Sequence, residues 1–423
     1  MVAEVALRAS TVAEVAPGVL RDLRPFLAVA RSGSIAEAAR ELERSSATVS
    51  RAISEMERIL GVPLFERTSR GLVPTAAGTA TLARGKRIET ELRHAAQQVA
   101  VARSQADGVH VEPAPDWWYD ARRLRLAIAL TELRRVSLAA DALGLTQAGA
   151  SMALRRLEEG VGLELFERTA GGLLPTYAAV QVAAHGSRVE AELRHLVSDL
   201  ASLGDCSGGS VVVGALPLGR TTVLPSAIAE VVAAHAGIRV TTVESHFEHL
   251  LDGLRSGSID VLLSAARDAD GLDGCVAEPL FEDRLALIAG AGHRLAGRES
   301  VRTDELLAER WVLPRATSSS RRLFEEALRA VGLVPPVPLV ESADLAVVRH
   351  LVVADGAVAV VSARQFEVEL GRGDLVELRT ELPPMTRSVR LLRRAGTVTS
   401  PALDALLVAL RRSAAATTTR SRA

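Results

Sequence analysis

The chain has 423 residues, of which 48% are hydrophobic and 24% are charged, and its formal net charge is −1. A chain of this length is expected to form about two to four soluble globular domains of ~100–200 residues each. The neutral balance argues against attraction of the whole molecule to polyanions, although local basic surfaces remain possible. The two cysteines provide no disulfide framework.

The N-terminal stretch Met1–Pro17 does not have the pattern of an export signal. Glu4, Arg8 and Glu14 interrupt its Ala- and Val-rich sequence, so that no basic start is followed by a continuous apolar core. No stretch approaches the roughly 18 consecutive apolar residues that a membrane-spanning helix needs. The sequence therefore predicts a cytosolic protein without a membrane anchor.

One segment of the chain occurs twice. The sequence "VPLFERTSRGLVPT" at Val62–Thr75 returns as "LELFERTAGGLLPT" at Leu163–Thr176, 101 residues later and without a gap. The same offset carries "ELRH" at Glu91–His94 onto "ELRH" at Glu192–His195. A register held over some 70 residues predicts the tandem duplication of one folded unit. Two copies are too few for a solenoid, so we expect two similar small domains in series.

The first copy has the pattern of a helix, a short helix, a third helix, a hairpin and a long helix. Ser34 of the Gly33-Ser34 pair can cap the short helix, and Gly61 can cap the end of the third. A hairpin turn is expected at Ser69–Gly71. Long helices are expected over Ala76–Gln98 and, in the second copy, over Ala178–Leu200.

This order of elements is typical of a winged helix-turn-helix domain with an appended linker helix. In that geometry the third helix enters the DNA major groove and the hairpin, or wing, contacts the flanking backbone. Hydroxyl and guanidinium side chains in both places can reach base edges and phosphates. The candidate DNA contacts of the first copy are Ser45, Ser46, Thr48, Ser50, Arg51, Ser54, Arg67, Thr68 and Arg70. The alternative is an ordinary solvated helix face.

The whole first copy closely resembles the DNA-binding domain of LysR-type transcriptional regulators. The motifs that carry the resemblance are Gly33-Ser34, Ala38-Ala39, Ser45-Ser46, Val49-Ser50-Arg51, Leu60-Gly61, Leu64-Phe65-Glu66-Arg67 and Thr75–Gly78. One departure is Ser46, where the family commonly has Gln. The resemblance implies a DNA-binding regulator in which two chains ordinarily pair through their linker helices.

The second copy departs from the first at positions that matter for DNA. Met152 stands where the first copy has Arg51, and Gly171 stands where it has Arg70. Losing two Arg side chains would remove phosphate or base contacts. The candidate DNA contacts that remain are Thr146, Gln147, Ser151, Arg155 and Arg168. This copy either binds DNA with its own preference or is a degenerate copy kept for packing.

From Ser210 onward, expected strands alternate with helices. "SVVVGALP", "RVTTVES" and "IDVLLSA" are expected strands, and Thr222–His235 and "HFEHLLDGLRSGS" are expected helices. A second lobe begins near Asp304, and "SVRLLRRAG" is expected to return to the first lobe as a strand. Such alternation predicts a parallel, doubly wound sheet, in which ligands bind at the carboxyl ends of strands and at helix N-termini.

Residues from about Gly209 to Arg394 resemble the effector-binding domain of the same family, in phrases such as "GALPLGRTTVLP" and "VADGAVAVVSA". This resemblance implies the two-lobed periplasmic-binding-protein type II fold, with a small-molecule effector between the lobes. Hydroxyl groups and free amides there suit an anionic or polyhydroxylated ligand, such as a sugar or an aromatic or other organic acid. The candidate effector contacts are Leu216, Pro217, Gly219, Arg220, Thr221, Ser264, Arg315, Thr317, Ser318 and Ser319. Alternatively, the serine run only caps a helix and Arg220 is solvated.

Other chemistry is weakly supported. His246 and His249 lack a third ligand in sequence, and Cys206 and Cys275 lack the spacing of the redox-sensing branch of the family. Ser264 lacks a nucleophile elbow, and no phosphate-binding glycine loop is present. We therefore expect no enzyme activity, no cofactor and no metal.

The expected fold is multidomain, with two winged helix-turn-helix domains followed by an α/β two-lobed periplasmic-binding-protein type II effector domain. The expected boundaries are a tail at 1–19, copy one at 20–104, a linker at 105–116, copy two at 117–203, a hinge at 204–209, the effector domain at 210–395 and a C-terminal helix and tail at 396–423. We expect Arg412–Ala423 to be an unstructured tail.

The functional hypothesis is a LysR-type regulator that binds double-stranded DNA, senses a small molecule and forms homo-oligomers. We expect the two long helices to pair within one chain and to favour an asymmetric operator. In a competing arrangement, copy two pairs with copy two of another chain. The alternative function is a small-molecule-binding adaptor whose helical domains contact protein.

Overall fold

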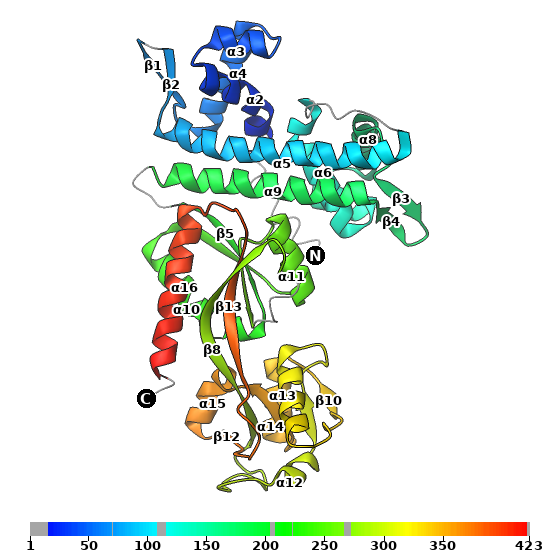
Figure 1. The fold of residues 1–423 in the computed structure, drawn as a ribbon, viewed down its shortest axis with the longest axis vertical. Helices are drawn as coiled ribbons and strands as arrows, with labels where there is room; N and C mark the ends of the chain where they lie inside the picture. The colour runs from blue at the N-terminus through cyan, green and yellow to red at the C-terminus, as the bar shows by residue number, and fades with distance from the viewer. Residues whose placement is uncertain are drawn as a thin grey trace.

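The computed structural model describes residues 16–69, 71–107, 116–203, 208–221, 223–265 and 272–420. An N-terminal helical part lies across one end of an elongated C-terminal α/β part (Figure 1). Arg70, Cys206, most of the expected linker and most of the expected hinge lie outside the described residues. Among the residues that are described, no helix is long and apolar enough to cross a membrane.

The first segment of the helical part contains the elements that its sequence predicts. They are α2 (Ala16–Ser32), α3 (Ile35–Glu41), α4 (Ser46–Leu60), β1 (Phe65–Thr68), β2 (Gly71–Pro74) and α5 (Ala76–Asp107). The Ser34 side chain caps α3 by accepting from the Glu37 amide, and Gly61 ends α4 with a left-handed φ of 70°. Both caps agree with the sequence prediction.

Two boundaries of this segment were predicted wrongly. The expected tail to residue 19 is helical from Ala16, because Val19 and Leu20 are fully buried in the hydrophobic core. Helix α5 continues past Gln98 to Asp107, into the expected linker. Val99 of this extension packs into the same core, and this burial stabilises the additional helical turns.

The second segment of the helical part repeats the first. Its elements are a 3-10 turn (Asp116–Tyr119), α6 (Ala121–Leu133), α7 (Val136–Ala142), α8 (Gln147–Val161), β3 (Phe166–Thr169), β4 (Gly172–Pro175) and α9 (Tyr177–Ala201). From α3 to β2, every boundary recurs 101 residues later. Side-chain contacts recur too. Glu57 accepts from the Leu64 amide at 2.8 Å, and at the same offset Glu158 accepts from the Leu165 amide at 2.9 Å.

Each segment has one non-glycine residue in the left-handed region where the other has glycine: Glu43 against Gly144, and Arg134 against Gly33. Gly33 has a φ of 68°, and its carbonyl accepts from the Leu72 amide at 2.9 Å. Arg134 takes its place with a φ of 55°, and its carbonyl accepts from the Leu173 amide at 2.7 Å. A non-glycine residue in this left-handed region costs about 1 kcal/mol. The same wing contact is therefore kept at a cost in stability.

Helices α5 and α9 lie side by side and antiparallel (Figure 1). The Tyr177 hydroxyl at the start of α9 lies 3.2 Å from the Gln98 amide oxygen near the end of α5, and Asp199 near the end of α9 lies 2.7 Å from Arg84 near the start of α5. Both helices contribute fully buried residues to one hydrophobic core, among them Ile88, Leu92, Val189 and Leu193. The two segments therefore share a core rather than forming separate ones.

The α/β part contains a nine-stranded mixed sheet. Its strands are β5 (Gly208–Ala215), β6 (Gly237–Val243), β7 (Val261–Ala265), β8 (Cys275–Gly290), β9 (Trp311–Leu313), β10 (Val340–Glu341), β11 (Val358–Ser362), β12 (Leu375–Glu377) and β13 (Thr386–Arg394). The main path runs β10-β9-β11-β8-β13-β7-β5-β6, with β12 paired to β8.

The expectation of a parallel sheet is wrong in the middle of this path. Strand β8 is 16 residues long, much longer than the strand expected from "RLALIAGAG", and it passes from one lobe to the other. Because β13 returns alongside it, β8 pairs antiparallel with β11, β12 and β13, and β13 pairs antiparallel with β7. The outer pairs, such as β5 with β6 and β9 with β11, are parallel as expected.

Helices cover both faces of each lobe. They are α10 (Val223–Ala234), α11 (Phe247–Ser256) and α16 (Pro401–Arg420) on the first lobe, and α12 (Thr303–Leu307), α13 (Ser319–Ala330), α14 (Leu345–Ala354) and α15 (Glu367–Arg372) on the second. The expected tail from Arg412 is instead helical to Arg420. Leu410 and Ala414 are buried against the first lobe, which explains why this helix continues.

Candidate functional sites

Helix α4 presents a polar face to solvent. The expected contacts Ser45, Ser46, Thr48, Ser50, Arg51 and Ser54 are all exposed. The opposite face of α4 buries Val49, Ala52, Ile53 and Met56 against the core. Ser45 caps the helix by accepting from the Thr48 amide at 3.1 Å, so its side chain has a structural role as well. The six exposed residues are therefore hydrogen-bonding groups, and Arg51 is the cation among them.

The hairpin β1–β2 projects beside this helix (Figure 1). Arg67 and Thr68 are exposed on β1, and the Thr68 hydroxyl donates to the Gly71 carbonyl at 3.1 Å. Arg70 lies outside the described residues. The geometry of this wing is therefore compatible with the phosphate contacts expected for Arg67 and Thr68.

Helix α8 has the same geometry as α4 but presents different side chains to solvent. Gln147, Arg155 and, on the wing, Arg168 are exposed, and Ser151 is half-buried. Thr146 caps the helix by accepting from the Gly149 amide at 3.0 Å. Met152, at the position of Arg51, is 57% exposed. Sequence comparison of the copies identified this substitution, but not how far the apolar side chain projects into solvent.

A cavity of about 1010 Å³ lies between the two lobes of the α/β part. Eight of the expected effector contacts line it, namely Leu216, Pro217, Gly219, Ser264, Arg315, Thr317, Ser318 and Ser319. Thr221 does not line it, because its hydroxyl donates to the Leu218 carbonyl at 3.1 Å and closes a turn. The Arg220 backbone belongs to that turn, and its side chain is not described. Polar lining residues that sequence reasoning missed include Glu244, His246, Glu341, Asp344, Gln365 and Arg387.

Arg387, on β13, links β8 to α13 and lines this cavity. Its guanidinium donates to Asp283 at 2.9 Å and to the hydroxyls of Ser319 and Ser320 at 3.0 and 2.7 Å. Asp283 is 1% exposed and also accepts from Ser362 at 2.6 Å. The serine run therefore has structural partners, in line with the alternative that sequence analysis left open.

Two basic side chains face each other across the cavity, one from each lobe. Arg315 follows β9 in the second lobe, and His246 precedes α11 in the first, with Nη1 and Nε2 3.5 Å apart. At this distance the guanidinium can donate to an unprotonated Nε2, and the remaining N–H groups of both side chains can donate to an anion bound beside them. His249 does not line the cavity, so the His246–His249 pair does not form a joint site there.

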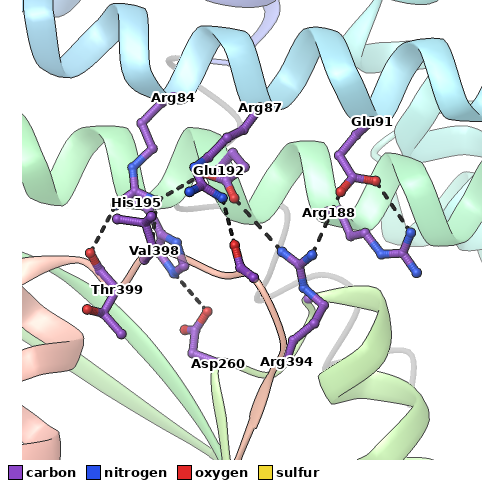
Figure 2. Close-up of polar contacts among 12 residues, drawn as sticks. Arg84, Arg87, Glu91, Arg188, Glu192, His195, Asp260, Arg394, Val398 and Thr399 are labelled. Carbon is purple, nitrogen blue, oxygen red and sulfur yellow. Dashed lines mark hydrogen bonds and ion pairs between the residues drawn. The ribbon is translucent and has the colours of Figure 1, made fainter. Parts of the chain in front are cut away.

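Arg84 lies at the junction of α5, α9 and the α/β part (Figure 2). Its guanidinium contacts Glu192 at 3.0 Å and Asp199 at 2.7 Å, and it donates to the carbonyls of Val398 and Thr399. Arg84 and Glu192 are each only 2% exposed. Burial alone would lower the pKa of Arg84, but hydrogen bonds and charges from Asp199 and Glu192 raise it above its usual value.

The repeat relates this buried pair to a second one. At the 101-residue offset, His185 corresponds to Arg84 and Glu91 corresponds to Glu192, and His185 Nδ1 lies 2.7 Å from the Glu91 carboxylate. Arg394, at the end of β13, lies 3.7 Å from Glu91 and 3.9 Å from Glu192, between the two pairs. Although burial opposes it, the hydrogen bond from His185 and the nearby guanidiniums hold the pKa of Glu91 below its usual value.

Glu91, His94 and His185 also bring three potential metal-ligand atoms within 4.8 Å of one another. The guanidinium of Arg188 lies 3.4 Å from Glu91 and 3.3 Å from His185. Because this cation lies within hydrogen-bonding distance of two of the three candidate ligand groups, the cluster is better explained as an ion-pair network.

Asp260 joins α9 to the first lobe. It is buried, and it accepts from Arg194 at 2.7 Å, His195 at 2.9 Å and the Val212 amide at 2.8 Å. Burial would raise the pKa of Asp260, but the charges of Arg194 and His195 and these hydrogen bonds hold it far below its usual range. The repeated "ELRH" motif therefore has a different role in each copy, which its sequence did not indicate.

The cysteines do not form a described pair. Cys275 is a free, half-buried thiol, and burial raises its pKa. A raised pKa reduces the thiolate fraction on which reactivity depends. Cys206 lies outside the described residues.

Comparison with known proteins yields two family models. "Bacterial regulatory helix-turn-helix protein, lysR family" matches residues 20–79 and again 121–180, and "LysR substrate binding domain" matches residues 206–415. A curated relative, "HTH-type transcriptional regulator GalR" of Pseudomonas putida, is 39% identical over 392 residues, which are 93% of this chain and 96% of the relative. A second, the "Probable hydrogen peroxide-inducible genes activator" of Streptomyces viridosporus, is 29% identical and covers 68% of this chain and 92% of itself. These families and relatives are regulators rather than enzymes.

Solved structures share the fold. Full-length OxyR C199D from Pseudomonas aeruginosa aligns with a TM-score of 0.53 at 21% identity, covering 69% of this chain and 97% of its own. CbnR, a LysR family transcriptional regulator, aligns with a TM-score of 0.52 at 19% identity, covering 70% of this chain and 99% of its own. These two regulators align over nearly their full length but cover only about two thirds of this chain, whereas the Pseudomonas putida relative covers nearly all of it.

Proposed function

Because the chain belongs to the LysR family of DNA-binding transcriptional regulators with an effector-binding domain, we propose that it binds its operator as an intrachain pair of winged helix-turn-helix domains. We place these domains at residues 20–104 and 117–203 and attribute them to a tandem duplication. The effector domain occupies residues 210–395, and a small molecule in its cleft controls how the pair engages DNA.

The observation that carries this proposal is the pairing of α5 with α9. Family members with one such domain need a second chain to supply a partner linker helix. Here the partner helix is part of the same chain, and the buried residues of the two helices belong to one core. Recurrence of every boundary from α3 to β2 at one offset supports a duplicated domain, and the matches at residues 20–79 and 121–180 are in keeping with it. Because the two recognition faces differ, the operator should be asymmetric rather than palindromic.

Chemical cross-linking tests the pairing directly. In a chain whose native cysteines are replaced by Ser, Gln98→Cys and Tyr177→Cys place two thiols where the native side chains touch. A short bismaleimide should link them within one chain, so that the mass on a denaturing gel stays that of a monomer. As a control, the Gln98→Cys chain alone should gain no link. A covalent dimer as the main product would contradict the proposal and favour pairing between chains.

We also propose that the effector is a small organic anion that binds beside Arg315 and His246. These side chains come from opposite lobes, so an anion that accepts hydrogen bonds from both would bridge the lobes. Hydrogen bonds to charged groups contribute about 1.5–3 kcal/mol each. Arg315→Gln should therefore weaken binding of an organic acid about tenfold to a hundredfold in calorimetric titration.

The ligand panel should pair small organic acids with their uncharged amides. Arg322→Gln, which changes an exposed residue on α13 that does not line the cavity, is the matched control and should bind like the native chain. If the amides bind as well as the acids, or if both variants bind alike, the assignment of an anion to this position is wrong.

A further inference from the structure

The recognition faces of α4 and α8 differ in chemistry although their backbones correspond residue by residue. Among the candidate DNA contacts of α4 the exposed cation is Arg51, and at the same place on α8 is Met152, 57% exposed. Leu145, which precedes α8, is 44% exposed where the first segment has Arg44. The core-facing side of α8 is already filled, by Ala150, Leu154, Leu157 and Val161. Met152 is therefore not needed for packing within the chain, and its side chain is accessible for contact with DNA.

The chemistry of the major groove limits what Met152 could contact. A thioether side chain is flexible and apolar and has no hydrogen-bond donor to offer a guanine or a phosphate. The apolar feature on a base edge in the major groove is the 5-methyl group of thymine. Gln147, exposed in the first turn of α8, carries the amide that pairs bidentately with adenine. Helix α8 thus carries one group suited to each base of an A·T pair.

The first segment presents the opposite preference. Arg51 is exposed, and a guanidinium pairs bidentately with the O6 and N7 atoms of guanine. Ser46 stands there in place of Gln147, so the adenine-reading amide is absent from α4. On α8, exposed Arg155, Arg156 and Arg168 can still supply phosphate contacts, which position a domain without specifying sequence.

We propose that α8 reads an A·T-rich half-site through Met152 and Gln147, while α4 reads a half-site that contains guanine through Arg51. This assignment rests on the proposed intrachain pair of DNA-binding domains. It gives the asymmetric operator a defined order, because the two helices sit at fixed positions on the antiparallel α5–α9 pair. The exposed Leu145 and Met152 would otherwise suit a protein partner, which the experiment below distinguishes.

The experiment uses the full chain and an operator selected from random duplexes. The variant Gly171→Cys, made in a chain whose native cysteines are replaced by Ser, carries an iron chelate on the new thiol. The chelate cleaves the DNA strand next to it, and the cleavage position shows which half-site the second segment occupies. Uracil is then substituted for thymine one position at a time, which removes only the 5-methyl group. At the thymine facing Met152 the dissociation constant should rise about fourfold, the loss expected when about one buried methyl group is removed.

Matched variants test whether the weaker binding to the uracil duplex depends on Met152. Met152→Ala should bind the thymine and uracil duplexes equally well, and because Met152 is exposed this change should not impair folding. Met152→Arg should shift the selected base in that half-site toward guanine. In the other half-site, 7-deazaguanine should weaken the native chain about tenfold and the Arg51→Met variant far less.

The outcomes separate this inference from the function on which it rests. If cleavage marks the second half-site but no uracil position affects binding, the reading by Met152 is wrong and the intrachain pair stands. If tethered cleavage is absent while the first half-site is protected, the second segment does not bind DNA. The proposed pair then fails as well, and Leu145 and Met152 become a protein-docking face.

Discussion

Replacing Arg84 with Met should lower the free energy of unfolding by about 3–5 kcal/mol, the cost of leaving a buried charge without its partner. Glu192 is 2% exposed and Asp199 is 17% exposed, and both carboxylates would lose the guanidinium that donates to them at 2.7–3.1 Å. The carbonyls of Val398 and Thr399 would lose their donor as well. Urea denaturation of the full chain, followed by circular dichroism, measures the change.

Arg58→Met is the control for this variant. Arg58 pairs with Glu55 at 2.7 Å on the exposed side of α4, where solvent screens the interaction. Its midpoint of unfolding should stay close to that of the native chain. A second variant, Arg84→Met with Glu192→Met, removes both charges and should recover part of the loss, because no uncompensated Glu192 charge remains. If Arg84→Met were no more destabilising than Arg58→Met, the ion network would have no structural importance.

Replacing Asp260 with Asn should destabilise the contact between α9 and the first lobe by a similar amount, about 3–5 kcal/mol. Arg194 is 10% exposed on its side chain and would lose its carboxylate partner, and Asn offers one neutral oxygen in place of the two charged ones that Arg194, His195 and the Val212 amide share. The amide of Val212 would lose a charged acceptor too. Urea denaturation at neutral pH measures the effect, and limited proteolysis should cut more readily between the helical part and the α/β part.

Acidification gives an independent measurement on the same residue. The pKa of Asp260 is lower in the folded chain than the value of about 3.9 in an unfolded one. The ionised carboxylate therefore contributes its full stabilisation above that unfolded value, and the contribution is lost as the pH falls below about 4. The native chain should lose more stability between pH 5 and pH 3 than Asp260→Asn does.

Asp304→Asn is the matched control for acidification. Asp304 also has a lowered pKa, because of its hydrogen bonds from Arg302 and from the Glu305 amide, but it lies on the exposed surface. Its replacement should leave the pH dependence of stability close to that of the native chain. Equal slopes for the native chain and for Asp260→Asn would show that Asp260 does not make this contribution.

Local features of this protein were predictable because they depend on residues close together in the chain. Ser34 and Gly61 cap their helices as expected, since capping needs only a side chain or a left-handed glycine at a helix end. The exposed face of α4 followed from the spacing of its apolar residues. In the cleft, Arg315 and Thr317 were placed through the family resemblance, and the structure brings both to the cavity.

Features that depend on distant partners were missed or predicted wrongly. Nothing near Glu91 or Glu192 in the chain distinguishes a surface carboxylate from one buried beneath a second helix. Arg387 and Asp283 come from separate strands and meet only because β8 and β13 run antiparallel through both lobes. Helix α16 continues beyond Arg412 because a lobe folded from much earlier residues covers its apolar face.

By itself, the sequence determined the repeat, its 101-residue register, the elements of each copy and the family resemblance. All of these depend on motifs and patterns among residues that are close together in the chain. Only the tertiary structure decided that α5 and α9 pair within one chain, and that the matching Glu91 and Glu192 meet His185 in one half and Arg84 in the other. The physical reason is that a buried charge is stabilised by whatever partner the fold brings within hydrogen-bonding distance. Identical motifs can therefore acquire different partners when each packs against a different neighbour.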